Sequence, residues 1–167
     1  MKATMWRPTQ RPLLLLLPCA LLALGLAACG EPSPEDLARE SESIRQALLL
    51  YLPKMADAYA TGDVEQLEGM ASQKERAILD KNVRQLAQQG RTVRTELREL
   101  TIEDLNLISH ANAYVTTVEE WDVRVYAQGT DRLLGEDLGQ VSRVQYQLKR
   151  QDGEWLLLSR NSNPVGQ

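Results

Sequence analysis

The spacing of the apolar residues changes at Gly90, and this change limits what the chain can fold into. Before Gly90 the apolar residues recur every three or four positions, which is the period of a helix. After Gly90 they alternate with polar residues, which is the period of a strand with one buried face. Helices followed by strands predict an α+β domain whose helices cover one face of a curved antiparallel sheet.

The first predicted helix has clear signals at both ends. Ser33 is a favourable N-cap and Pro34 is a favourable first helical residue. Gly62 is typical of a helix end. We therefore predict a helix over residues 34–61, with a kink or a short break at Pro53, because proline removes one backbone hydrogen bond.

Two further helices are expected before the strands begin. Asp63 can cap a short helix over residues 64–70. Ser72 and Glu75 have the spacing of a capping box, in which each side chain bonds the backbone N–H of the other residue. This box predicts a third helix, over residues 72–89.

After Gly90 we predict four strands, with a loop between the second and the third. Residues 93–109 alternate imperfectly, which favours one long strand with a bulge or two short strands. Residues 113–128 alternate cleanly. Residues 129–139 are polar and contain glycine, so we expect a loop there, and residues 141–150 alternate again.

Asp152-Gly153 is the strongest hairpin signal in the sequence, because both residues tolerate the positive φ of a type I′ turn. This turn pairs Gln151 with Glu154 and places Tyr146 opposite Ser159. We expect the domain to span residues 34–161 and the remaining residues, 162–167, to be a tail.

The first 28 residues have the pattern of a secretory signal. Lys2, Arg7 and Arg11 precede an apolar run that is shorter than the about 20 residues of a membrane-spanning helix. Leu26-Ala27-Ala28-Cys29 resembles the lipobox of bacterial lipoproteins at every position. The resemblance implies cleavage before Cys29 and lipidation of this cysteine, whereas the alternative is an ordinary secretory signal with an accidental cysteine.

A lipid on Cys29 would be the membrane partner of this chain, because two or more acyl chains attach stably. The resemblance to lipoproteins implies a bacterial envelope, with the domain facing the periplasm and residues 29–33 as the lipidated cysteine and its tether. In Gram-negative lipoproteins an Asp after the cysteine usually signals retention in the inner membrane. This chain has Gly30 there, which favours the outer membrane.

The charge and the ligand-type residues exclude several function classes. All 23 acidic residues follow residue 28, whereas three of the 19 Lys and Arg precede it. The remaining chain is therefore acidic, which argues against nucleic-acid binding. His110 is the only histidine, and only one cysteine would remain after cleavage, so we expect no metal site and no cofactor.

Two short stretches resemble the NTF2-like superfamily, which has a cystatin-like α+β cone. They are Tyr59–Glu65 (YATGDVE), between two predicted helices, and Tyr146–Trp155 (YQLKRQDGEW), around the hairpin turn. The resemblance implies helices packed on a curved sheet, in a fold whose members range from isomerases to scaffolds. Residues 113–121 (AYVTTVEEW), followed by a Tyr strand and a Trp strand, are similar to the intermembrane-space domain of ARC6-type plastid division proteins, which implies partner binding without chemistry.

Glu119 is the strongest candidate for chemistry. Strand alternation places it on one face with Val115, Thr117 and Trp121, the face that we expect to meet the helices. A carboxylate removed from water can serve as a general acid or base, as an Asp or His does in NTF2-like enzymes. The alternatives are that Glu119 lies at the rim of the sheet or pairs with an arginine.

The large aromatic residues are candidates for a ligand pocket, because the NTF2-like fold often encloses a cone-shaped cavity. With Glu119, the candidates are Trp121, Tyr146 and Trp155, and Tyr126 belongs to the same set. The alternative is that these residues only fill the core.

Three interpretations of function follow from these observations. The first is a membrane-anchored, non-catalytic module that binds a protein partner or a small apolar ligand in the cell envelope. The second is an enzyme of the isomerase or dehydratase kind that uses Glu119 in the cone. The third is a homodimer whose sheets pack together, which would leave only the rim of each sheet for partners.

Overall fold

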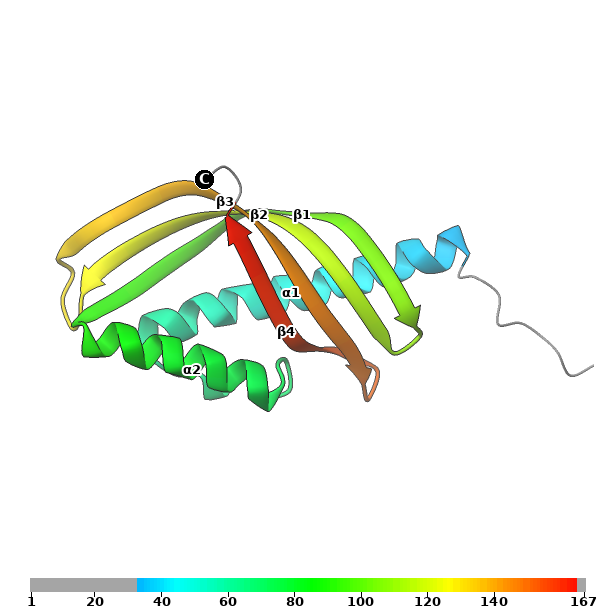
Figure 1. Cartoon of the computed structure of the whole chain (residues 1–167), viewed down its shortest axis with the longest axis horizontal. Helices are drawn as coiled ribbons and strands as arrows, with labels where there is room; N and C mark the ends of the chain where they lie inside the picture. Colours follow the sequence, from blue (N-terminus) through cyan, green and yellow to red (C-terminus); the bar gives the residue numbers. More distant parts are fainter. Residues whose placement is uncertain (1–32, 165–167) are drawn as a thin grey trace, which may run out of the picture. The chain divides into compact units, whose positions relative to one another are not determined.

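The computed structural model describes residues 33–164. Four strands form one antiparallel sheet in the order β1-β2-β3-β4, and two helices lie on one face of it (Figure 1). The domain is therefore α+β, as predicted. Its elements are α1 (Pro34–Thr61), the 3₁₀ turn η1 (Glu65–Leu67), α2 (Gln73–Gln88), β1 (Arg91–Ser109), β2 (Asn112–Ala127), β3 (Leu133–Gln151) and β4 (Glu154–Pro164).

The expected signal peptide and Cys29 lie outside the described residues. Within residues 33–164, no helix is long and apolar enough to cross a membrane. A compact unit begins at Ser33, and the core residues of the described part all lie in it. We therefore expect this unit to fold without the residues that precede it.

Helix α1 begins and ends where the sequence predicts. The hydroxyl of Ser33 accepts a hydrogen bond from the backbone N–H of Asp36 at 3.1 Å. Gly62 has a φ of 86° and donates its N–H to the carbonyl oxygen of Ala58. The helix continues through Pro53, whose ring is exposed, so the expected break is wrong.

The two ends of α1 have different surroundings. Residues 34–43 contribute no buried side chain, and in Figure 1 they project past the end of the sheet. From Ile44 onward, one side of the helix packs on the sheet. Its buried residues have helical spacing: Ile44, Leu48, Tyr51, Leu52, Met55, Ala56 and Ala58.

The short helix predicted at residues 64–70 is wrong, because only the turn η1 forms there. The chain beyond it is extended and pairs with β4. Leu157 donates its N–H to Met70 O at 2.9 Å, and Ser72 donates its N–H to Leu157 O at 2.7 Å. These two hydrogen bonds to β4 compete successfully with a local helix.

Helix α2 is capped by half of the predicted capping box. The hydroxyl of Ser72 accepts a hydrogen bond from the N–H of Glu75 at 3.2 Å. The reciprocal bond is replaced, because the N–H of Ser72 already donates to Leu157. The side chain of Glu75 is therefore available for another contact, and it is buried.

The loop predicted at residues 129–139 is wrong for most of its length. The turn between β2 and β3 ends before Leu133, and residues 133–137 pair with residues 123–126 of β2. These β3 residues are all exposed, so the sequence has no apolar alternation to reveal the strand. Of β3, only the second half pairs with β4. Strand β4 continues to Pro164, so residues 162–164 belong to the sheet and not to the expected tail.

The hairpin at Asp152-Gly153 is confirmed, with φ values of 52° and 91°. Gln151 pairs with Glu154, as predicted. The predicted pairing of Tyr146 with Ser159 is wrong, because the register shifts by one residue at Leu158 and Tyr146 lies opposite Arg160. A β-bulge changes the sheet face on which the following side chains lie, so the side chain of Arg160 lies on the inner face.

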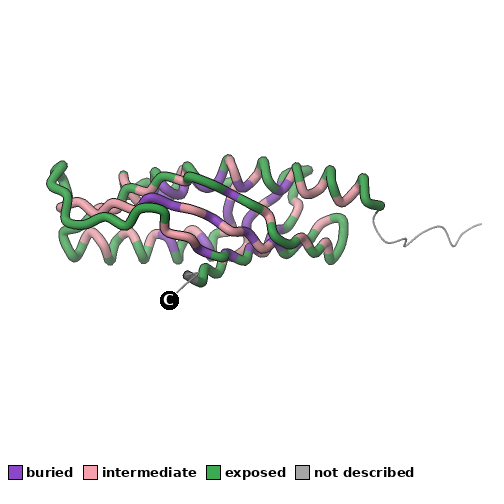
Figure 2. Tube along the Cα trace, turned by 90° about the horizontal axis from the view of Figure 1, so that it is seen from above, coloured by how far each residue is buried: buried purple, intermediate pink, exposed green. Residues whose placement is uncertain are grey.

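Strand β1 is one long strand with irregularities, which confirms the first of the two predicted arrangements. Its register against β2 shifts between Leu97 and Glu99, and the register of β2 against β3 shifts between Trp121 and Val123. These two irregularities are neighbours across the sheet and bend it at one level. The buried residues therefore concentrate in the middle of the domain, between α1 and the inner face of the sheet (Figure 2).

Candidate functional site

Glu119 is buried among three neutral hydrogen-bond donors. Its side chain lies on the inner face of β2, and the residue is 1% exposed. Oε1 accepts hydrogen bonds from Thr117 Oγ1 at 2.8 Å and from the Tyr146 hydroxyl at 2.5 Å, and Oε2 accepts one from Trp121 Nε1 at 2.9 Å. A rim position is therefore wrong, and within residues 33–164 Glu119 forms no ion pair with an arginine.

Simple strand geometry brings these groups together. Thr117, Glu119 and Trp121 are two residues apart on β2, so their side chains share one face. Tyr146 comes from the adjacent strand β3 and is completely buried. Burial and the nearby charge of Glu119 both raise the pKa of the Tyr146 hydroxyl, which therefore stays protonated and donates to the carboxylate.

Arg160 is the residue that the sequence reading missed, because only the bulge at Leu158 turns it inward. Its side chain is 24% exposed. One guanidinium nitrogen donates to the thioether sulfur of Met55 at 2.7 Å, and Nε lies 3.7 Å from Glu75 Oε1, which is too long for a hydrogen bond. A guanidinium has several N–H donors and a thioether is a weak acceptor, so Arg160 is poorly satisfied by the described residues.

Glu75 is the nearest carboxylate to Arg160. It is 4% exposed, and this burial raises its pKa, while the charge of Arg160 acts in the opposite direction. Tyr51 lies in the same region, and burial also raises the pKa of its hydroxyl. In the described part of the chain, this hydroxyl has no hydrogen-bond partner.

Glu119 and Arg160 line the same small pocket, with a volume of about 150 Å³. The pocket lies between the inner face of the sheet and α1. Thr95 of β1 contributes to its wall, and the Thr95 hydroxyl is buried without a partner among residues 33–164. The remaining lining residues are Met55, Tyr59, Trp121, Val123, Gln140, Ser142, Val144 and Ser162.

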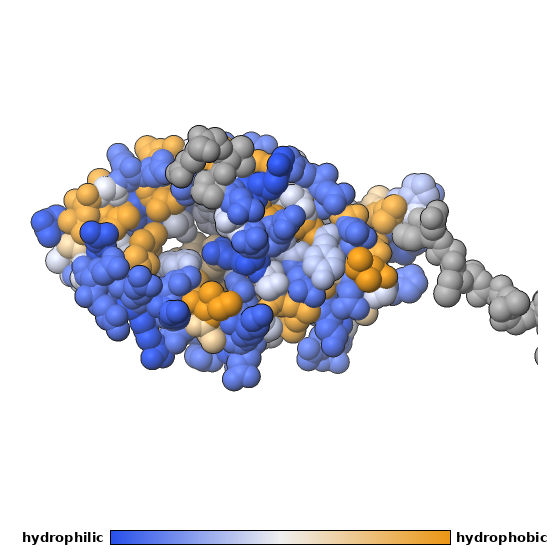
Figure 3. All heavy atoms as spheres, viewed as in Figure 1, coloured by the Kyte–Doolittle hydropathy of each residue, from blue (hydrophilic) through white to orange (hydrophobic). Residues whose placement is uncertain are grey.

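A larger groove of about 620 Å³ lies between α1 and β1. Figure 3 shows the surface hollowed between the helices and the sheet. Thr95 and Trp121 line both the groove and the small pocket, so the two spaces meet at these residues. The apolar part of the groove is formed by Leu49, Pro53, Ala56, Ala60, Leu97 and Trp121.

Two of the predicted pocket residues lie elsewhere. Trp155 packs under the guanidinium of Arg150, which is 4.5 Å from the ring centroid and pairs with Glu40. Tyr126 lies under Arg94, 4.4 Å from its ring centroid. The structure therefore places Glu119, Trp121 and Tyr146 together and separates Trp155 and Tyr126 from them.

His110 lies in the predicted turn between β1 and β2 and is exposed. In the part of the chain that the structure describes, no group of three His, Cys, Asp or Glu residues could hold a metal ion.

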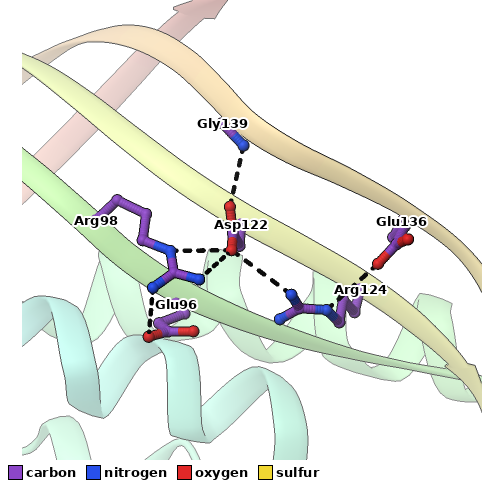
Figure 4. Close-up of polar contacts among 6 residues, drawn as sticks. All are labelled: Glu96, Arg98, Asp122, Arg124, Glu136 and Gly139. Atoms are coloured by element: carbon purple, nitrogen blue, oxygen red, sulfur yellow. Dashed lines mark hydrogen bonds and ion pairs between the residues drawn. The ribbon is translucent and has the colours of Figure 1, made fainter.

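The outer face of the sheet carries a row of ion pairs at the level of the bend (Figure 4). Asp122 is 6% exposed, and Oδ2 accepts hydrogen bonds from Nε and Nη2 of Arg98 at 2.9 and 2.5 Å. Oδ1 accepts the N–H of Gly139 at 3.0 Å. The row continues with Arg124, which contacts both Asp122 and Glu136, so it ties β1, β2 and β3 together.

No protein-family model and no curated protein matches this sequence. The fold, in contrast, has many similar structures. The intermembrane-space region of the chloroplast protein ARC6 matches with a TM-score of 0.63 and 14% identity, over 77% of this chain and 97% of that chain.

Two further structures have the same architecture. A suggested dehydratase of the NTF2-like family from Streptomyces avermitilis has a TM-score of 0.51 and 15% identity, over 78% of this chain and 99% of that chain. A periplasmic fragment of TraM has a TM-score of 0.51 and 11% identity, over 72% of this chain and 98% of that chain. Because all these identities are low, the similarity concerns the fold alone, and the fold of this domain is NTF2-like.

Proposed function

We propose that this chain is a non-catalytic binding module, anchored to a bacterial envelope by a lipid on Cys29, that takes up a small apolar ligand in the groove between α1 and β1. The observation that carries the proposal is the groove itself. Its volume of about 620 Å³ lies in the range of small-molecule sites, and Leu49, Ala56 and Leu97 give it an apolar wall.

The hydrogen bonds of Glu119 support a non-catalytic role. A general base needs a carboxylate oxygen that faces its substrate. Both oxygens of Glu119 already accept hydrogen bonds from core side chains, and one of these donors, Tyr146, is completely buried. The carboxylate thus holds β2 and β3 together on their inner face.

Ligand uptake can be tested with the fluorescence of Trp121, which lines the groove. In the chain from Gly30 onward, Trp155→Phe leaves Trp121 as the only tryptophan. We expect a dibrominated alkane to quench this fluorescence with saturation. Ala60→Leu narrows the groove and should weaken the quenching, and quenching that fails to saturate or is unchanged in Ala60→Leu would contradict the proposal.

The lipid anchor rests on the sequence from Leu26 to Cys29. It can be tested by metabolic labelling with an alkyne analogue of palmitate in a Gram-negative host. We expect Cys29→Ser to remove both the label and the association with membranes. Cys19→Ser is the matched control, because Cys19 lies in the expected signal; labelling that survives in Cys29→Ser would exclude this anchor.

A catalytic role of Glu119 is the second candidate function, with an isomerase or dehydratase reaction. It is favoured by one observation, that the carboxylate and Arg160 line the same pocket. Replacing a catalytic group often leaves stability unchanged or increases it, whereas replacing a structural group lowers stability. A Glu119→Gln chain with unaltered resistance to urea would therefore favour the enzyme.

A further inference from the structure

We infer that the small pocket beside the groove recognises the uncharged, hydrogen-bonding head of a single-chain amphiphile, such as a glycerol monoester, whose acyl chain lies in the groove. This inference rests on the proposed uptake of an apolar ligand. It adds the polar end of that ligand and the residues that would bind it.

Arg160 supplies the main donor. The guanidinium lines the pocket, yet its contacts within residues 33–164 are the Met55 sulfur and a carboxylate oxygen of Glu75 at 3.7 Å. The side chain is 24% exposed, so water can reach its remaining N–H donors, and an ester or hydroxyl oxygen in the pocket would take the place of that water.

Thr95 supplies a second donor at the point where the two spaces meet. Its hydroxyl is buried and has no partner in the described part of the chain, and the residue lines both the pocket and the groove. A ligand that extends from the groove into the pocket would pass Thr95, and a turn of its side chain would bring the hydroxyl to the ligand. The junction of its chain and its head is therefore the natural partner of Thr95.

Charge and size select the kind of head. Two carboxylates, those of Glu119 and Glu75, flank the single guanidinium of Arg160, so an anionic head would meet more negative than positive charge. The pocket volume of about 150 Å³ equals the share of about five water molecules in the liquid, and the bonded atoms of a glyceryl head lie closer together than separate waters do. A glycerol ester fits this room, whereas a phospholipid head carries both the wrong charge and too many atoms.

The test compares three probes with the same dibrominated acyl or alkyl chain: a glycerol monoester, the free fatty acid and the alkane. Each is titrated into the Trp155→Phe chain from Gly30 onward, and quenching of Trp121 gives the dissociation constant. We expect the monoester to bind about ten-fold more tightly than either of the others, because hydrogen bonds to a charged donor are worth this much.

Thr95→Val and Arg160→Lys test the two donors separately. Thr95→Val keeps the shape of the side chain and removes only the hydroxyl, so it also serves if Arg160→Lys fails to fold. Each variant should weaken monoester binding and leave alkane binding as it is. Equal affinity for all three probes, or tighter binding of the fatty acid, would overturn the inference alone, whereas the absence of saturable quenching by any probe would overturn the proposed function with it.

Discussion

The polar side chains of the core are satisfied unequally. Glu119 accepts three hydrogen bonds, whereas the hydroxyls of Tyr51 and Thr95 have no partner within residues 33–164. An unpaired buried polar group costs free energy, whereas a satisfied one fixes the positions of its neighbours. Removal of a buried polar side chain should therefore change the free energy of unfolding by different amounts at different positions.

Glu119→Gln should lower the free energy of unfolding by about 2–3 kcal/mol. The amide oxygen can accept from Trp121 Nε1, but the NH₂ group then meets the hydroxyls of Thr117 and Tyr146, which must accept instead of donate and lose their hydrogen bonds to a charged acceptor. Urea unfolding measures the loss. Glu120→Gln, one position along on the outer face of β2, is the matched control, and a similar loss in both variants would contradict the structural role of Glu119.

Asp122 should make the domain sensitive to acid. Its hydrogen bonds with Arg98 lower the pKa of this carboxyl below the usual value of 3.8, with a further contribution from the N–H of Gly139. The stabilisation is thus present above the unfolded-state pKa and is lost as the pH falls through the lower folded-state pKa. Thermal melts below about pH 4 should show a steeper loss for the wild type than for Asp122→Asn. Asp131→Asn, which changes an exposed acid, should lose thermal stability with falling pH as steeply as the wild type. An equally steep loss in the wild type and in Asp122→Asn would refute the prediction.

The sequence predicted Glu119 and missed Arg160 for a physical reason. Regular alternation along β2 fixes which side chains face inward, and nothing interrupts it between Ala113 and Trp121. Alternation along β4 is interrupted at Leu158, whose carbonyl oxygen accepts a hydrogen bond from the hydroxyl of Ser72, far away in the sequence. A bulge that depends on a tertiary contact leaves no local pattern to read.

At the scale of elements, the junction before α2 connects the helices to the sheet. Ala71 forms a bridge with Leu157, and the hydroxyl of Ser72 donates to the carbonyl oxygen of Leu158 at 2.9 Å while it accepts from Glu75. One side chain therefore caps a helix and holds the bulge of β4. The position of Arg160 depends on both.

Ser72→Ala should lower the free energy of unfolding by about 1–2 kcal/mol, because it removes a cap and a hydrogen bond to the bulge. Ser33→Ala removes only the exposed cap of α1 and should cost about 0.5–1 kcal/mol. Urea unfolding of the two variants makes a direct comparison. Equal losses would mean that the contact between Ser72 and Leu158 contributes nothing to stability.

The elements that the sequence predicted well are those with local signals. The ends of α1 follow from Ser33 and Gly62, and the last hairpin follows from Asp152-Gly153. The first half of β3 was missed because both of its faces are exposed, so pairing with β2 holds it in place without an apolar pattern. The helix expected at residues 64–70 was lost to hydrogen bonds with β4, which are contacts that no short window of sequence contains.

At the scale of the whole molecule, the outer sheet face decides how the domain can associate. This face carries the ion pairs of Asp122 and a two-bonded pair between Arg143 and Glu103, with both distances 2.8 Å. Packing two such faces together would remove these charges from water, which is costly unless every charge finds a new partner.

We therefore expect the homodimer through the sheets to be weak, with the chain from Gly30 onward a monomer at low micromolar concentration. Size-exclusion chromatography with light scattering measures the mass directly. A stable dimer that Arg143→Ala leaves intact would contradict the expected monomer and would place the contact away from Arg143. A dimer that Arg143→Ala dissociates would also contradict it and would place the contact on this face.

The bulge at Leu158 makes the lining of the pocket depend on the length of β4. Loss of Leu158 would remove the extra residue and leave Arg160 opposite Tyr146. Gain of one residue after Leu158 would instead place Ser159 opposite Tyr146 and turn Arg160 to solvent, because the bulge holds one extra residue. The pocket would then exchange a cation for a small hydroxyl without any substitution. Among descendants of this gene, a single codon inserted at this position would thus change what the pocket can bind, whereas a codon inserted among the exposed residues 133–137 would change only the end of a strand.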